Sequence, residues 1–444
     1  MEASILPKVE SGKVELVANS DLSFLRVATS YVESASLAFG LGETETLSLT
    51  IAVEEIFVQL CKIMLPTDTI RINVFGSGFE VVLEFIFSSH DLDLRSFNMV
   101  CVPDDSGDFE CNDETGMIIA SRMVDSFSLE SSESHLKLKL VKEKYYPEIE
   151  HLSVVTPAPS GALDIREAGV DELKELTRMA SVNYTQAAVP ESFKFPGKVV
   201  DMASVGYLKT AVAKDNSGVL AGGLVWKSES DKLVTFRGPY VAPECRGTDI
   251  ASRLVDYMLE HVARTNALGV MSTWPSSDLP TQMFENLGSQ FFFEDGRQQE
   301  VNAYFRLLNE DDGNVVTVHP CMVDFLREKY LDLFLARHID TFSDSGETRA
   351  AHSVLSAFIL RMSNRIILRP VIYGRDAVEN IKAHVNFLMA DGLTNIFFQM
   401  DLGFADNGRF APALIHNSFQ PRIVVPMAGK SDMVIFQYIP GGDH

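Results

Sequence analysis

The sequence YVAPECRGTDIASRL, residues 240–254, carries the most specific pattern in this chain of 444 residues. Its first residues end a run rich in β-branched and aromatic side chains, and the apolar period of a helix follows from Asp249 onward. Between the two, Arg246 and Gly247 belong to a predicted loop. The backbone N–H groups of a loop that enters a helix bind anions, and the helix dipole adds to this effect. The segment therefore predicts a strand, an anion-binding loop and a helix in direct succession.

The residues on both sides predict a regular order of strands and helices. A strand at 163–167 and a helix at 170–181 come first, and Asp-Asn-Ser-Gly at 215–218 predicts a hairpin turn. Around that turn, strands are predicted at 208–214, 219–227 and 233–242. The elements predicted afterwards are a helix at 249–265, a strand at 270–274, a helix at 279–287 and short strands at 290–294 and 302–307. An antiparallel meander thus leads into a strand, a helix and a strand.

Residues 240–254 resemble the acetyl-CoA-binding motif of the GNAT acetyltransferases, and the surrounding order is similar to the GNAT fold. Arg246 matches the first position of the family pattern, Gly247 the common arginine-glycine opening, and Ala251 the sixth position. Asp249 stands at the fourth position, where the family has glycine. Its carboxylate is suited to cap the helix, where it competes with a pyrophosphate for the same N–H groups.

The resemblance implies a protein that binds acetyl-CoA or another acyl-CoA and transfers the acyl group to an amine. It continues through residues 269–293, and in this family the strands before and after the loop separate to admit the thioester. The residues implied in cofactor binding are Val241, Arg246, Gly247, Thr248, Asp249, Ile250 and Ala251. The reaction needs a base for the amine and an acid for the thiolate. Candidates near the cleft are Glu244, Asp278 and Tyr304, although no motif specifies them and each also fits a surface or packing position.

The first part of the chain predicts an α+β arrangement. Strands are predicted at 12–20, 69–74, 79–87 and 135–142, and helices at 22–39 and 45–64. In the second helix, Glu55 and Gln59 lie one turn apart beside an apolar stripe. These two side chains either form part of a site or belong to the solvated side of an amphipathic helix.

This helix resembles the first motif of the GHKL ATPases, in particular the small serine kinases that act as anti-sigma factors. Glu55 matches the glutamate that orients the attacking water or hydroxyl, and Gln59 stands where the family has a magnesium-binding asparagine. Residues 114–125, which include Gly116, resemble the phosphate segment. The family's adenine-binding aspartate-x-glycine segment is missing from residues 85–97. ATP and magnesium are therefore not expected as ligands.

The last part of the chain predicts a partial repeat. Strands are predicted at 315–319, 365–373, 394–400, 422–426 and 432–438, and helices at 322–337, 377–390 and 408–418. From residue 365 onward this order repeats the second half of a GNAT domain, with residues 373–376 in place of the arginine-glycine loop. The whole chain resembles bacterial fusion proteins that join an anti-sigma regulatory factor to an acetyltransferase.

The predicted fold class is therefore a multidomain α+β and α/β protein. It comprises a GHKL-like α/β sandwich (the first segment, 1–145), a linker (146–161), a GNAT domain (the second segment, 162–309) and a second GNAT-like half (the third segment, 310–444). A length of 444 residues agrees with several domains, since single cores stop growing at about 250–300 residues.

Composition excludes several classes of function. The formal charge of −23 opposes binding to nucleic acid and to anionic membrane surfaces, and favours a cationic acceptor. No apolar run reaches the roughly 18–20 residues that span a bilayer, and the N-terminus lacks an export signal, so a cytoplasmic location is expected. The five cysteines, expected to be reduced, lack metal-ligand spacing, so no metal site is expected.

Three functions remain open at this point. The first is an N-acyltransferase that acts on a small-molecule or protein amine, with the first segment as a regulator. The second is a non-catalytic regulatory protein with a protein partner, since Asp249 and Gln59 replace residues that the two chemistries need. The third is a serine kinase of the anti-sigma type, which the missing adenine segment disfavours.

Overall fold

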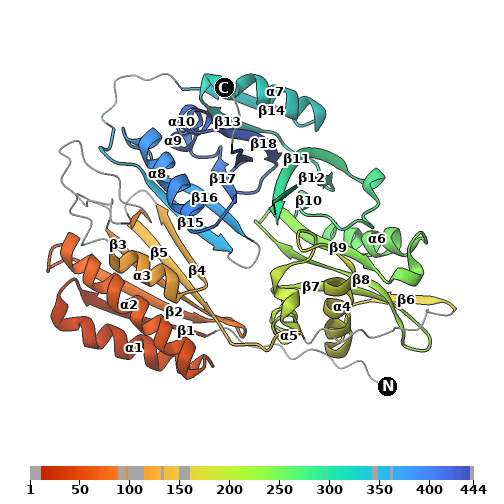
Figure 1. Cartoon of the computed structure of the whole chain (residues 1–444), viewed down its shortest axis with the longest axis horizontal. Coiled ribbons are helices and arrows are strands. Elements are labelled where there is room, and N and C mark those ends of the chain that lie inside the picture. Colours follow the sequence, from red (N-terminus) through yellow and green to blue (C-terminus); the bar gives the residue numbers. More distant parts are fainter. Residues whose placement is uncertain are drawn as a thin grey trace.

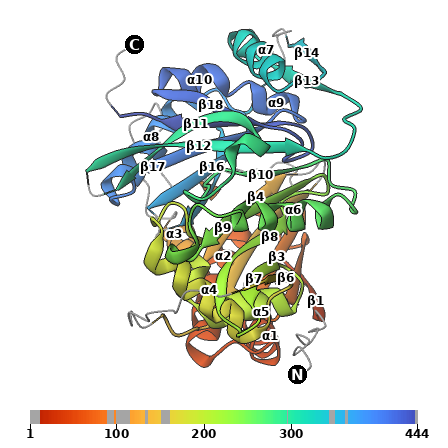
Figure 2. The same ribbon diagram turned by 90° about the vertical axis from the view of Figure 1, so that its right-hand side faces the viewer.

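The computed structural model describes residues 12–88, 97–98, 115–131, 135–149, 161–294, 296–342, 349–360 and 364–440. In these ranges the strands form four sheets, and the three larger sheets come from the first, second and third segments respectively. The molecule is a mixed α/β assembly in which the third segment lies above the other two (Figures 1 and 2). None of the helices in this part of the chain has the length and apolar character needed to cross a membrane.

Several predicted features lie outside the described residues. They are residues 150–160 of the predicted linker, Cys101, Cys111, Glu114 and residues 89–96 of the stretch compared with the adenine-binding segment. The other three cysteines, Cys61, Cys245 and Cys321, are free thiols, as expected.

The first segment forms a five-stranded antiparallel sheet with helices on one face (Figure 1). The strands, in sheet order, are β1 (Gly12–Asn19), β2 (Thr69–Gly76), β3 (Glu80–Ser88), β5 (His135–Glu143) and β4 (Ser126–Ser131). The helices are α1 (Leu25–Ala38), α2 (Glu43–Ile63) and α3 (Thr115–Met123). In β3, Val81, Leu83, Phe85 and Phe87 point into the core because alternate side chains of a strand share a face. The GHKL assignment stays a prediction.

The second segment forms a seven-stranded sheet in the order β11-β12-β10-β9-β8-β7-β6. The strands are β6 (Leu163–Arg166), β7 (Lys209–Asp215), β8 (Leu220–Ser228), β9 (Leu233–Val241), β10 (Gly269–Ser272), β11 (Glu285–Glu294) and β12 (Arg297–Leu307). The helices are α4 (Val170–Asn183), α5 (Pro196–Ser204) and α6 (Ile250–Val262). Only β9 and β10 run parallel, and α6 connects them. This is the predicted meander followed by strand, helix and strand.

The helix predicted at 279–287 is wrong. The chain makes one 3-10 turn at Thr281–Met283 and then enters β11. Residues of β11 pair with β12 along their length and pack against the third segment, and this tertiary pairing outweighs the local helical pattern. The connection where the GNAT resemblance implies a helix therefore has one 3-10 turn, and only residues 285–287 of it belong to β11.

The third segment repeats the topology of the second. Its five-stranded sheet contains, in order, β15 (Val354–Leu360), β16 (Arg365–Ile372), β17 (Asn395–Asp401), β19 (Met433–Tyr438) and β18 (Phe419–Val425). The pair β16 and β17 is parallel and is connected by α8 (Ala377–Ala390), whereas the other neighbours are antiparallel. Position by position, this is the order β8-β9-β10-β12-β11 of the second segment.

Two further predicted helices are shorter than expected. The helix predicted at 322–337 is α7 (Val323–Asp332), after which β14 (Arg337–Thr341) pairs in parallel with β13 (Asn314–Val318). The helix predicted at 408–418 is divided into α9 (Ala405–Gly408) and α10 (Ala411–His416). In the first case Phe334 adopts a positive φ of 54°, a conformation that ends a helix.

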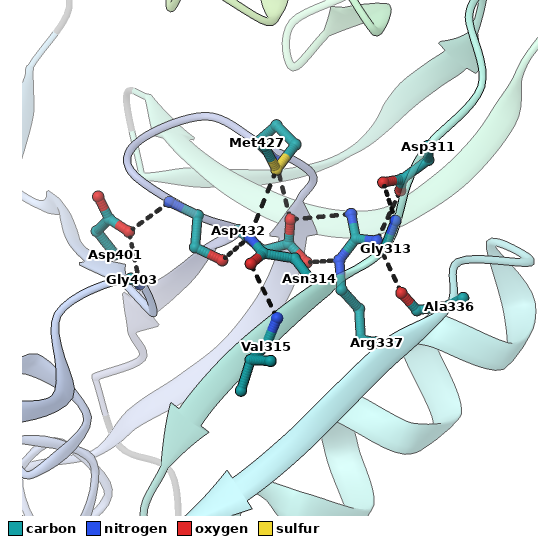
Figure 3. A network of polar contacts seen from close by, with 11 residues as sticks. Asp311, Gly313, Asn314, Val315, Ala336, Arg337, Asp401, Gly403, Met427 and Asp432 are labelled. Carbon is teal, nitrogen blue, oxygen red and sulfur yellow. Dashed lines mark hydrogen bonds and ion pairs between the residues drawn. The ribbon is translucent and has the colours of Figure 1, made fainter.

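A buried ionic network attaches the β13–β14 pair to the large sheet of the third segment (Figure 3). The Arg337 side chain has no exposed surface, and its Nε and Nη2 donate to the Asp432 carboxylate at 2.6 and 3.2 Å. Its Nη1 donates to Asp311 at 2.6 Å. Asp432 also accepts the Met427 N–H at 3.0 Å. A buried guanidinium is thus satisfied by two carboxylates.

The second and third segments pack side by side, but their sheets stay separate. Two fully buried amide side chains of the third segment satisfy the outer edge of β11. Gln437 bonds both the N–H and the C=O of Phe291, and Asn395 bonds both groups of Phe293 at 2.8 and 2.9 Å. The two amides therefore replace a neighbouring strand at an edge that would otherwise be open.

We expect Gln437→Met to lower the free energy of unfolding by about 1–3 kcal/mol, because the Phe291 backbone groups lose their partner. Equilibrium denaturation of the variant checks this value, with Gln420→Met, at an exposed position of β18, as the control. Equal stabilities of the two variants would mean that the amide contacts do not hold the interface.

Candidate functional site

The strands that flank the predicted anion loop separate as expected. β9 and β10 pair only where residues 233–235 face residues 269–271. Beyond that point β9 continues to Val241 along β8 without pairing to β10. The opening between the two strands lies next to the loop that leads into α6.

The loop leaves several backbone donors free. In the described part of the chain, no hydrogen-bond acceptor is found for the N–H groups of Gly247, Asp249 and Ala251. The Ile250 N–H has only a long contact of 3.5 Å with the Thr248 hydroxyl, which itself donates to the Cys245 carbonyl at 2.7 Å. Free N–H groups at the start of a helix of 13 residues are suited to bind a phosphate.

The prediction that the Asp249 carboxylate caps the helix is wrong. Asp249 occupies the N-cap position, but its side chain is exposed and accepts no capping hydrogen bond. Its φ of −80° and ψ of 0° differ from the extended conformation that brings a cap side chain onto the first-turn N–H groups. The carboxylate therefore does not occupy the donors that a pyrophosphate needs.

Of the three predicted catalytic candidates, the structure brings Asp278 to the loop. The Asp278 carboxylate lies 3.7 Å from Arg246 Nε, and the Arg246 guanidinium lies 5.0 Å from the centroid of the Tyr184 ring. The Tyr184 hydroxyl donates to Asp278 and accepts the Val241 N–H at 2.5 Å. Tyr184, which directly follows α4, was not predicted from the sequence. Its neighbours along the chain give no pattern that marks it.

The surroundings keep the Tyr184 hydroxyl protonated at neutral pH. Burial raises the pKa of Tyr184 to about 12, with a further contribution from its hydrogen bond to Asp278, while the Val241 N–H acts in the opposite direction. A phenol with this pKa is a proton donor that does not ionise under ordinary conditions.

The other two candidates lie apart from this cluster. Glu244 is exposed on the 3-10 turn Pro243–Cys245. Tyr304 faces Ser272 across the β10–β12 pair and packs against the core beneath α6. Among the described residues, neither has a hydrogen bond or ion pair with Tyr184, Asp278 or Arg246.

In the first segment, the structure brings two of the predicted nucleotide-site residues, Gly116 and Glu55, close together. A Cβ at Gly116 of α3 would lie 2.8 Å from Glu55 Oε2 of α2. Gln59 is only 7% exposed, so its interpretation as a solvated side chain is wrong, because α3 packs over this face of α2. Within the described ranges, no group of three or more His, Cys, Asp or Glu side chains is placed to hold a metal ion.

A cavity of 1230 Å³ lies where the three segments meet. Its wall includes Glu130 of β4, Thr235 and Arg237 of β9, Trp274 after β10, and Arg365 of β16. Thr235 is at the point where β9 and β10 part, so the cavity borders the opening between these strands. Sequence reasoning missed this cavity, since its residues are brought together only by the packing of the three segments.

No protein-family model and no curated protein matches the sequence. Solved structures that are similar to about a third of the chain are GNAT acetyltransferases. One is a phosphinothricin acetyltransferase from Sinorhizobium meliloti in complex with acetyl-CoA, which is 19% identical, with 34% of this chain and 90% of that chain covered and a TM-score of 0.29. An N-acetyltransferase from Staphylococcus aureus Mu50 is 16% identical, with 34% and 100% covered and a TM-score of 0.30. A spermidine/spermine N-acetyltransferase from Vibrio cholerae is 19% identical, with 33% and 92% covered and a TM-score of 0.27.

Proposed function

We propose that the second segment binds an acyl-CoA and transfers its acyl group to an amine. The observation that carries this proposal is the set of free N–H groups of Gly247, Asp249 and Ala251 at the start of α6, beside the opening between β9 and β10. Free donors at this place fit the pyrophosphate, and the opening fits an extended thioester arm.

Tyr184 and Val241 have the chemistry that the transfer step needs. The Val241 N–H points at the Tyr184 hydroxyl, and it is available to a thioester carbonyl once that hydroxyl moves aside. The amine nitrogen attacks the thioester carbon, the C–S bond breaks, and the thiolate takes the Tyr184 proton. The proton lost from nitrogen returns to the Tyr184 oxygen through Asp278 or water. Asp278 positions Tyr184 in this scheme.

Calorimetric titration of the intact protein with acetyl-CoA tests the proposal. We expect saturable binding by the native chain, and about three- to fivefold tighter binding by Asp249→Asn, because one exposed negative charge near the pyrophosphate is removed. Asp256→Asn, on the exposed side of α6, changes the net charge equally and is the matched control. Absence of binding by the native chain and by Asp249→Asn would contradict the proposal.

A second function is supported by the hydrogen bond that the Val241 backbone N–H already donates. Its N–H already bonds the Tyr184 hydroxyl, and Asp278 and Tyr184 hold Arg246 beside the loop. In a regulatory protein that has this fold but does not transfer acyl groups, these contacts close the opening between β9 and β10. Under this alternative, native protein binds no acetyl-CoA and Tyr184→Ala gains binding. The acyltransferase proposal predicts binding by the native chain, so one titration separates the two.

A further inference from the structure

The cavity between the three segments contains a buried cation that forms no ion pair with any described residue. Arg365, the first residue of β16, is only 9% exposed, and its Nε is buried without a hydrogen-bond partner. Among the described residues it has no ion pair. Its guanidinium lies 4.3 Å from the centroid of the Trp274 ring and 5.9 Å from that of Phe292. Aromatic rings stabilise the charge but leave the N–H donors unused, and an unpaired buried charge is costly.

A second arginine contacts the backbone of Trp274. Arg237 belongs to the part of β9 that has separated from β10, and its Nη1 donates to the Trp274 carbonyl at 3.0 Å. Burial lowers the pKa of both guanidinium groups, that of Arg365 to about 9, and the proximity of Arg237 contributes to the shift at Arg365. Two cationic groups therefore share one wall of the cavity.

One carboxylate oxygen in this region also has no hydrogen-bond partner among the described residues. Glu191, on the 3-10 helix Glu191–Lys194, lines the same cavity, and its Oε1 is buried without a hydrogen-bond partner. It is near enough to Arg365 for its negative charge to raise the pKa of that residue. The cavity thus has unused donors and an unused acceptor near each other.

We infer that this cavity binds a small molecule that carries both a carboxylate and a primary amine, that is, an amino acid or a short peptide. The ligand carboxylate lies between Arg237 and Arg365, since planar guanidinium groups pair with carboxylates through two parallel N–H bonds. The ligand ammonium group pairs with Glu191. The volume of 1230 Å³ accommodates a ligand of this size.

This ligand deepens the proposed function, because the cavity borders the opening between β9 and β10 and the bound amine is then the acyl acceptor. In that respect the inference rests on the proposed function. The net charge of the chain favours a cationic acceptor, but the local charges at Arg237 and Arg365 select an acceptor with an acidic group.

Titration calorimetry with the intact protein, without acyl-CoA, tests the binding. The probes are the L-amino acids and glycyl dipeptides. Four of the amino acids are also compared with the corresponding amine that lacks the carboxylate. The pairs are lysine and cadaverine, arginine and agmatine, tyrosine and tyramine, and histidine and histamine. We expect at least one amino acid or dipeptide to bind, and the amines to bind about 100-fold more weakly than acids of the same side chain. Absence of binding by every acid and dipeptide, or equal binding of acid and amine, overturns the inference.

Arg365→Met supplies the second test. We expect it to weaken binding of the acid by about 10- to 100-fold, while the melting temperature stays unchanged or rises, because an apolar side chain replaces an unpaired buried charge. Arg422→Met is the matched control. Arg422 lies 4.3 Å from the centroid of the Phe291 ring and its Nε is also buried without a hydrogen-bond partner, but it does not line the cavity. Retained binding in Arg365→Met overturns the inference. Acetyl-CoA binding together with failure of all acids would reject this acceptor class and leave the proposed function standing.

Discussion

Replacement of Tyr184 by phenylalanine is expected to lower kcat for acyl transfer by about 10²- to 10⁴-fold, the range that general acid catalysis supplies. The ring and its packing against Tyr240 remain, and only the hydroxyl that contacts Val241 and Asp278 is lost. Because this hydroxyl is proposed to protonate the departing thiolate, KM for the acyl-CoA should change little. Release of free thiol from acetyl-CoA measures both parameters.

Tyr257→Phe is the control for this experiment. Tyr257 belongs to α6, lies against the His261 ring and has no place in the proposed step. It should keep the native kcat. Equal kcat values for Tyr184→Phe and the native protein would exclude Tyr184 as the acid.

The same cluster predicts a pH effect. The pKa of Tyr184 is raised to about 12 by burial and by Asp278, so the proton-donating form persists up to strongly alkaline pH. In Asp278→Asn the raising effect of the carboxylate is removed, and the pKa of Tyr184 falls toward its ordinary value of about 10. The alkaline fall of kcat should therefore begin at a lower pH in Asp278→Asn than in the native protein. An identical alkaline profile of the two proteins would contradict the role of Asp278.

Asp432→Ala is expected to lower the free energy of unfolding by about 3–5 kcal/mol. The substitution leaves Arg337 in a fully buried position with one of its two carboxylates gone, and the Met427 N–H loses its acceptor. The loss thus includes the cost of an insufficiently paired buried charge. Denaturation with guanidinium chloride, followed by tryptophan fluorescence, measures it, since Trp274 packs against Phe397 of the third segment.

The matched control for the buried pair is Asp340→Ala. Its carboxylate lies 2.9 Å from His338 Nε2 on the surface, with both side chains more than half exposed, and such a pair contributes less than about 0.5 kcal/mol. The triple variant Asp311→Asn/Arg337→Met/Asp432→Leu should recover much of the loss, because all three charges of the network are removed together. A triple variant as unstable as Asp432→Ala alone would contradict this account of the network.

Much of the fold could be predicted from sequence because the deciding patterns are local. The order of strands around residues 215–218 follows from alternating side chains and a hairpin turn, and residues 246–251 do form the loop that enters α6. The partial repeat after residue 365 could be recognised because the same succession of strand and helix appears twice. These features depend on neighbours that are close in the chain.

Features set by distant contacts could not be predicted. Residues 279–287 have the apolar period of a helix, but they make one 3-10 turn, and their last three residues join β11, which pairs with β12 and packs on β18. The side chain of Asp249 is a good cap by residue type, and only the backbone angles of the folded loop direct it outward. Arg365 and Trp274 are far apart in the chain, and no local pattern indicates that one lies over the other.

The central claim is acyl transfer at the opening between β9 and β10. The most direct measurement is thiol release from acetyl-CoA by the intact protein in the presence of amino acids and dipeptides, with the N-acetylated product detected by mass spectrometry. We predict thiol release that depends on the acceptor, together with one N-acetyl product per thiol. Native protein that neither binds acetyl-CoA nor releases thiol above the buffer rate with any acid or amine, while Tyr184→Ala gains acetyl-CoA binding, would contradict the claim and favour the regulatory function.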